Sequence, residues 1–313
     1  MRERRPIEEV KAQAEGLSEL LLKPLAHVLD GHEHLIVVPY GELHRLPFGA
    51  LCWKGKWLAE EKKLTQLPSA SVLGALPLTR GTDQVALKSQ RVLTIGGPDE
   101  MAYRTLDGEM RSLEPLTGAR DEARYVARVL GGTSLIGPEA TKIAVLDLLS
   151  AHSIFHFATH CILFEEAPLL SGVALANGEV LTVHELLASR FRADLVTLSG
   201  CDTGIGVLTG GQEIVGLSRG LLAAGAHRVV VSLWPVYDGA TAVLMSRFAD
   251  ALNRGEDPVD ALSSAQAAIR ALDAAGLSES REAIRDAETS IELVEPRAGD
   301  HPQRWAPFIL VGS

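Results

Sequence analysis

The sequence predicts an α/β fold in which a mainly parallel sheet is flanked by helices. From Arg91 onward, short apolar stretches rich in β-branched residues alternate with stretches of helical periodicity. This alternation is typical of parallel strands in one sheet with helices on its faces. The chain has 313 residues, of which 46% are hydrophobic, so it can bury a sizeable core and is not disordered as a whole.

The first part of the chain is less regular than the rest. Apolar residues recur at helical spacing over Pro6–Leu29, which predicts a helix, and Leu35–Val38 is a short apolar strand. The stretch Gly41–Leu51 contains glycine and proline and indicates a turn-rich loop. Trp57–Leu67 predicts a further strand or hairpin arm.

The polar stretch Thr79–Gln90 indicates a linker, and we place a domain boundary there. Residues 1–90 then form an N-terminal helix with a small α/β half-domain packed on the core, and residues 91–313 form the main domain. The main domain is predicted to contain strands at Val92–Ile95, Thr133–Ile136, Ser153–Ala158, Asp194–Leu198, Arg228–Trp234 and Trp305–Val311, helices at Ala119–Leu130, Thr141–Leu149, Gln212–Ala224, Asp238–Asn253 and Pro258–Ala271, a long loop at Gly96–Gly118 and a hairpin turn at Asn177-Gly178.

Charge and cysteine content exclude several classes of protein. The net charge is −10, whereas a protein that binds nucleic acid directly needs a basic face. No apolar run reaches the roughly 18 residues of a membrane span, and Met1–Arg5 is not followed by an apolar signal core. Three cysteines do not make a disulfide framework. We therefore expect a cytoplasmic protein without a nucleic-acid or membrane partner.

Two residues suited to be a nucleophile and its base follow two predicted strands. His160 comes after Ser153–Ala158, and Cys201 comes after Asp194–Leu198. The carboxyl ends of parallel strands meet at one edge of a sheet, where ligands bind. An imidazole there can take the thiol proton and later protonate a leaving amine. The backbone N–H groups of Cys201 and Cys161 are the candidates to stabilise the resulting oxyanion.

The spacing alone leaves simpler alternatives open. A cysteine at a strand end is usually a small buried apolar residue, and a histidine is often a hydrogen-bonded core residue. His156 and His160 are four residues apart, which on a strand separates them by about 13 Å and disfavours a shared metal ion. Gly210-Gly211 lacks the lysine of a phosphate-binding loop. We predict neither a metal nor a cofactor.

A set of motifs runs in order along nearly the whole chain. Phe157–His160 has the sequence F-A-T-H, and Leu198–Gly204 is similar to L-S-A-C-E-T-G. These motifs resemble the CHAT family of caspase-like cysteine peptidases, which is related to caspases, separases and gingipains. Further matching segments are Leu43–Phe48, Leu67–Ser71, Gly211–Arg219, Val231–Val236 with Asp238, and Trp305–Gly312.

The resemblance implies a fold and an activity. The fold would be a caspase-like three-layer sandwich, and His160 and Cys201 would form a catalytic dyad. The protein would be a cysteine endopeptidase that hydrolyses peptide bonds of a protein substrate through a thioester. Members of the family often act as regulated effectors in bacterial defence or signalling and are often fused to helical repeats. The resemblance thus implies a peptide substrate and a regulatory or helical-repeat partner.

The resemblance also points to substrate-binding residues. In basic-specific relatives the position two residues before the catalytic cysteine is an aspartate that lines the primary pocket; here it is Ser199, which has no charge to attract a basic residue. We therefore expect no strong preference for cleavage after a basic residue. Ser232 and Trp234 belong to the segment that, in caspase-like folds, lies beside the bound peptide. The peptide would add to the sheet as an extra strand.

Two departures from the family pattern keep other functions open. The family usually has glycine where this chain has Cys161, whose N–H can serve an oxyanion only if its backbone avoids a glycine-only conformation. The Cys161 thiol could oxidise onto Cys201 or be an inert packed group. The acidic stretch Gly276–Asp300 is interpreted as a surface insertion. The alternatives are a catalytically inactive scaffold that binds partner proteins and a non-peptidase thiol hydrolase.

Overall fold

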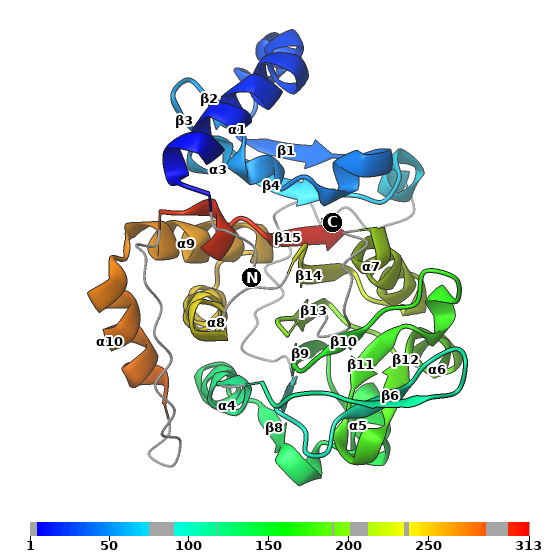
Figure 1. Cartoon of the computed structure of the whole chain (residues 1–313). Helices are drawn as coiled ribbons and strands as arrows, with labels where there is room; N and C mark the ends of the chain where they lie inside the picture. The colour runs from blue at the N-terminus through cyan, green and yellow to red at the C-terminus, as the bar shows by residue number, and fades with distance from the viewer. Residues whose placement is uncertain are drawn as a thin grey trace.

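An eight-stranded sheet crosses the centre of the molecule in the order β1-β4-β15-β14-β13-β9-β5-β8 (Figure 1). Neighbouring strands are parallel except for the antiparallel pair β14–β15. Helices cover both faces, which confirms the predicted α/β fold with a mainly parallel sheet. The computed structural model describes residues 5–74, 91–116, 118–189, 191–200, 212–234, 238–285 and 300–312.

The elements are short and follow one another closely along the chain. The strands are β1 (His34–Val37), β2 (Cys52–Trp53), β3 (Lys56–Trp57), β4 (Lys63–Gln66), β5 (Val92–Gly96), β6 (Ala102–Arg104), β7 (Met110–Ser112), β8 (Thr133–Ile136), β9 (Ile154–Ala158), β10 (Cys161–Ile162), β11 (Gly172–Ala174), β12 (Val180–Thr182), β13 (Leu195–Leu198), β14 (Arg228–Ser232) and β15 (Phe308–Gly312). The α-helices are α1 (Ile7–Leu21), α2 (Ala26–Leu29), α3 (Leu58–Glu61), α4 (Ala119–Leu130), α5 (Lys142–Leu148), α6 (Val183–Ala188), α7 (Gln212–Ala224), α8 (Asp238–Asn253), α9 (Pro258–Ala271) and α10 (Ala274–Ile284).

Two apolar cores lie on the two faces of the sheet, because successive strand residues point to opposite sides. Phe155 of β9 and Val196 of β13 pack with α5, α6 and α7 in one core. Ile154 and Leu195, the residues just before them, pack with α8 and α9 in the other. The sheet is thus the middle of three layers.

The first strands extend this sheet at one edge. β1 pairs with β4, and β4 pairs in parallel with β15 at Gln66 and Val311. The predicted linker Thr79–Gln90 lies outside the described residues.

Several predicted elements are shorter or more broken than expected. The helix predicted over Pro6–Leu29 is interrupted by a 3₁₀ turn at Lys23–Leu25, because Pro24 has no amide hydrogen and its ring clashes with the preceding helical turn. The loop predicted at Gly96–Gly118 contains the β6–β7 hairpin, whose second strand is fully exposed and so has no apolar signature. The hairpin turn at Asn177-Gly178 is confirmed, since both residues have a positive φ between β11 and β12.

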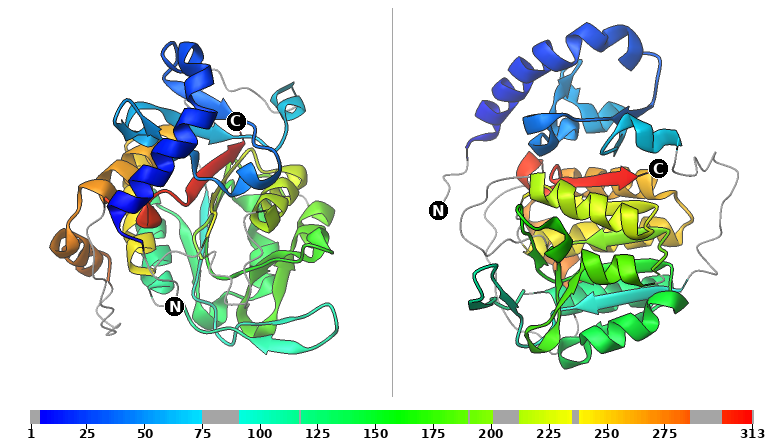
Figure 2. Two further views of the ribbon diagram at one scale, coloured as in Figure 1. Left: turned by 45° about the horizontal axis from the view of Figure 1, so that its top comes forward. Right: turned by 90° about the vertical axis from the view of Figure 1, so that its right-hand side faces the viewer.

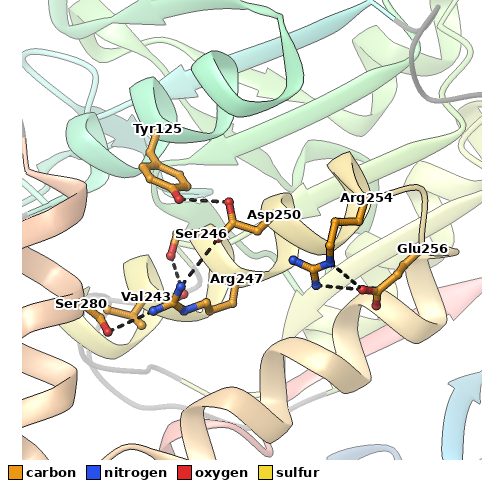
Figure 3. A network of polar contacts seen from close by, with 8 residues as sticks. All are labelled: Tyr125, Val243, Ser246, Arg247, Asp250, Arg254, Glu256 and Ser280. Atoms are coloured by element: carbon orange, nitrogen blue, oxygen red, sulfur yellow. Dashed lines mark hydrogen bonds and ion pairs between the residues drawn. The ribbon is translucent and has the colours of Figure 1, made fainter.

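Polar contacts join three helices on one face of the sheet (Figure 3). The Tyr125 hydroxyl of α4 donates a hydrogen bond to Asp250 of α8 (3.0 Å). Arg247 of α8 forms an ion pair with Asp250 (3.8 Å) and donates to Ser280 of α10 (3.2 Å). These contacts hold α4 in place against α8. In the part of the chain that the structure describes, no helix has the length and apolar character needed to cross a membrane.

The Tyr125–Asp250 hydrogen bond predicts a measurable loss of stability in one variant. Tyr125→Phe removes the donor and leaves a partly buried carboxylate with one contact fewer, so the free energy of unfolding should fall by about 1 kcal/mol. Tyr40→Phe is the matched control, because Tyr40 is 89% exposed. Urea denaturation of both variants measures the effect. Equal stability of both variants and the wild type would show that the bond contributes nothing.

Candidate active site

The carboxyl ends of β9 and β13 lie side by side. The two strands are parallel neighbours, and each residue of β13 pairs with the residue 41 positions earlier in β9, as Leu198 does with Phe157. Beyond the last pair, the Ser199 amide still donates to the Phe157 carbonyl (3.0 Å). His160 follows β9, and Cys201, which follows β13, lies outside the described residues.

Gly200 brings the two strand ends into direct contact. A Cβ atom at this position would lie 2.2 Å from the carbonyl oxygen of Thr159 and 2.8 Å from Leu116. Real Cβ atoms do not approach a backbone oxygen so closely, so glycine is required by the packing. The residue before Cys201 therefore contacts the residue before His160.

The imidazole of His160 is buried and oriented by a backbone group. His160 is only 3% exposed, and Nε2 of its ring lies 2.7 Å from the carbonyl oxygen of Glu114. A carbonyl oxygen only accepts hydrogen bonds, so Nε2 carries the hydrogen and Nδ1 is the basic nitrogen. Glu114 could not be identified from the sequence, since a backbone carbonyl can belong to any residue type.

The backbone of Cys161 avoids the conformations that only glycine adopts. Among the described non-glycine residues, only Lys54, Glu100 and Asn177 have a positive φ, so Cys161 is in a conformation open to any residue. It is 1% exposed and packs in the core that contains α5, α6 and α7.

The backbone N–H of Cys161 has a defined direction. The Ala174 amide donates to the His160 carbonyl (2.9 Å), so these two residues form a hydrogen-bonded pair. The next pair, Cys161 with Val173, is then a non-hydrogen-bonded pair, in which N–H groups point away from the partner strand. The N–H of Cys161 is therefore directed away from β11.

A buried carboxylate, Glu122 of α4, connects the two strands. Its Oε1 is 2.9 Å from Nε2 of His156 and also accepts a hydrogen bond from the Ser199 hydroxyl. His156 is thus a hydrogen-bonded core residue. Glu122 was not singled out in the sequence, although it is adjacent to Ala123 on the apolar face of the predicted helix, a position where an acid is unusual.

A small pocket opens beside Ser199. Its volume is about 20 Å³, room for about one water molecule, and it lies between the strand ends and the helices α4 and α8. Its walls are largely apolar, and the Glu122 carboxylate and the Ser199 and Thr241 hydroxyls supply its polar groups. The lining residues are Leu116, Ala119, Glu122, Ala158, Ser199, Gly200 and Thr241.

Ser232 and Trp234 lie at the carboxyl end of β14, the next strand in the sheet. Ser232 is buried, and its hydroxyl donates to the backbone carbonyl of Trp234. Trp234 is half-buried and packs on the same core as Cys161. The structure thus places both residues at the same edge of the sheet as Ser199. Among the described residues, no three acidic, histidine or cysteine side chains form a group able to hold a metal ion.

Comparison with known proteins identifies similar sequences and folds. The family model of the CHAT domain matches residues 11–313. Two curated relatives, the tetratricopeptide repeat protein 28 of Mus musculus and of Homo sapiens, are 26% and 28% identical over 97% and 99% of this chain. The chain spans only 13% of the length of each of these relatives.

The solved structures add a likeness in fold. The Saccharomyces cerevisiae separase–securin complex matches 89% of this chain and 15% of the compared chain, with a TM-score of 0.50 and 15% identity. The Arg-specific cysteine proteinase gingipain R matches 97% of this chain and 66% of its own, with a TM-score of 0.49 and 9% identity. The separase match confirms the predicted caspase-like sandwich.

The contact between Gly200 and Thr159 leads to a prediction. Gly200→Ala should lower the free energy of unfolding by about 2 kcal/mol, because its methyl group would overlap a backbone oxygen that cannot move freely. Gly16→Ala in α1 is the control, since a Cβ there meets nothing within 4 Å and alanine favours a helix. Thermal and urea unfolding of both variants compare them. A Gly200→Ala protein as stable as the control would contradict the packing described here.

Proposed function

The chain belongs to the CHAT domain family, and we propose that it is a cysteine endopeptidase in which Cys201 is the nucleophile and His160 is the general base. The observation that supports this most is the strand register. The pairing of β9 with β13 joins residues 41 positions apart, and His160 and Cys201 are also 41 positions apart. A register that continued past the described strand ends would set the two residues opposite each other.

The geometry of His160 suits the chemistry of acyl transfer. Nδ1 takes the proton of the Cys201 thiol as the thiolate attacks the carbonyl carbon of the scissile peptide bond. The same nitrogen then gives the proton to the leaving amine, and a thioester remains. Water, deprotonated by Nδ1, attacks the thioester carbon and releases the acid product and the thiol. The Glu114 carbonyl holds the ring throughout and stabilises the imidazolium.

The oxyanion and the peptide have candidate sites at the same edge. We propose that the N–H groups of Cys161 and Cys201 stabilise the oxyanion, which agrees with the direction of the Cys161 N–H away from β11. We propose that Ser199 lines the pocket for the residue before the scissile bond. Ser232 and Trp234 would border the extended peptide where it passes the carboxyl end of β14, because both edges of β14 are already paired, with β13 and with β15.

The loss of activity in two variants tests the proposed function. Cys201→Ala and His160→Ala should each lower peptide-bond hydrolysis by at least about a thousandfold, because one removes the nucleophile and the other its base. The measurement is mass-spectrometric mapping of new N-termini in a denatured proteome and in casein, with Cys52→Ala as the control variant. Cys52 is half-buried, and its burial raises the pKa of its thiol.

Each alternative function has its own outcome in this experiment. Cleavage that persists in Cys201→Ala would contradict the assignment of the nucleophile. A Cys201 that reacts with thiol probes in the absence of any new N-termini would favour a non-peptidase thiol hydrolase. A Cys201 that is unreactive in the folded wild type, without cleavage, would favour a catalytically inactive scaffold.

We also propose that the protein is a regulated effector in the reducing cytoplasm and that a helical-repeat partner binds its N-terminal helices. The curated relatives are named for tetratricopeptide repeats and extend far beyond the matched region. Figure 2 shows α1 and α2 at the outer edge of the molecule. The exposed apolar side chains of these helices and of the 3₁₀ turn Lys23–Leu25 between them suit a partner made of helices, and these residues are Leu17, Leu20, Leu25 and Val28.

A surface substitution tests the partner proposal. Leu20 is 73% exposed, so Leu20→Glu should leave the fold intact and reduce co-purification of a helical-repeat polypeptide from the source cells by at least about tenfold. Ile143→Glu on α5 is the matched control, because Ile143 is 71% exposed at a distant helix. Equal recovery of the partner with both variants, or recovery of no repeat protein with the wild type, would contradict the proposal.

A further inference from the structure

We propose that Glu122 is a positioning residue that fixes the two strand ends at the distance the reaction needs. One of its carboxylate oxygens, Oε1, accepts hydrogen bonds from His156 and Ser199. His156 lies four residues before the general base, and Ser199 lies two residues before the nucleophile. The inference rests on the proposed function, because it requires His160 and Cys201 to be the reacting pair.

The side chains of Glu122, His156 and Ser199 are joined by hydrogen bonds that restrict their movement. Glu122, His156 and Ser199 are all buried. The hydroxyl of Ser199 is shared between Glu122 and the Phe157 carbonyl, which is more distant (3.4 Å), and the Ser199 amide also donates to Phe157. If Oε1 were removed, the hydroxyl would keep only the long contact, and the His156 Nε2 hydrogen would lose its acceptor.

Glu122 is a buried acid among apolar neighbours on its helix. A buried carboxylate loses several kcal/mol of hydration, which its partners must offset. The neighbouring positions on the same face of α4 are the apolar Ala119, Ala123 and Val126. Glu122 also lines the pocket beside Gly200, and the carboxylate therefore lies at the strand ends where the two reacting residues follow.

The helix that carries Glu122 is itself held rigidly. The Thr94 hydroxyl of β5 donates to the Ala123 carbonyl of α4 (3.0 Å), and Tyr125 bonds Asp250 of α8 (Figure 3). Glu114, whose carbonyl orients His160, lies just upstream of the same helix. A shift of α4 would therefore move the support of the imidazole and that of both strand ends together.

The test compares four variants by the reactivity of Cys201. Glu122→Ala removes both hydrogen bonds, whereas Glu122→Gln keeps a carbonyl oxygen that can accept them. Ser199→Ala removes the link from Glu122 to the nucleophile strand and keeps the hydrogen bond between Glu122 and His156. Asp121→Asn is the matched control, because Asp121 is the adjacent buried acid of α4 and forms an ion pair with Arg124 (3.8 Å). The rate of iodoacetamide alkylation at Cys201 is measured against pH, with each cysteine followed separately by mass spectrometry.

We expect the alkylation rate of Cys201 to fall most in Glu122→Ala, less in Ser199→Ala, and little in Glu122→Gln. In Glu122→Ala, alkylation at pH 7 should slow by at least about tenfold, and the apparent pKa of the Cys201 thiol should move toward the free-thiol value of about 8.5. Ser199→Ala should slow it about threefold to tenfold, whereas Glu122→Gln and Asp121→Asn should stay within about threefold of the wild type. A purely structural role would lower the melting temperature and leave the pH profile unchanged.

Two outcomes would overturn the proposed role of Glu122, and a third would overturn the proposed function. If Glu122→Ala is folded and has the wild-type profile, Glu122 does not position the pair. If Glu122→Ala fails to fold, a Ser199→Ala profile identical to the wild type overturns the proposal equally. If the wild-type Cys201 itself titrates as an ordinary exposed thiol, the proposed function fails, whatever the variants do.

Discussion

The parallel pairing of β9 with β13 is the constraint on which the candidate site depends. Ile154 and Leu195 face the core that contains α8 and α9, and Phe155 and Val196 face the opposite core. A slip of one residue in either strand would exchange the side chains that face the two cores and disrupt the packing of both. The two cores therefore fix the register, and the register sets which residues come together beyond the strand ends. We propose that this apolar packing in turn sets where the nucleophile lies relative to its base.

A second group of contacts fixes the geometry near the carboxyl ends of β9 and β13 more closely than the strand register does. The packing of Gly200 on Thr159, the Glu114 carbonyl on His160 and the Glu122 carboxylate between the strands all act within one or two residues of the strand ends. Two of these groups belong to α4 or to the segment just before it. The helix thus connects the sheet, the small pocket beside Ser199 and the orientation of the imidazole.

Most of the sheet and the position of His160 could be predicted from the sequence, because buried strands and helix caps leave local patterns. The β6–β7 hairpin could not, since its strands are short and one is fully exposed. The break at Pro24 could have been predicted from its missing amide hydrogen. The Glu114 carbonyl has no residue signature, and the role of Glu122 depends on contacts with residues 34 and 77 positions away. Such long-range partners are decided by the tertiary fold.

A crystal structure of the chain covalently bound to a peptide chloromethyl ketone would test the central claim most directly. We expect the inhibitor to be attached to the Sγ atom of Cys201, with Nδ1 of His160 within hydrogen-bond reach of the reacting atoms and Nε2 hydrogen-bonded to the Glu114 carbonyl. An inhibitor attached to another cysteine, or an imidazole on the opposite side of the sheet from the Cys201 sulfur, would contradict it.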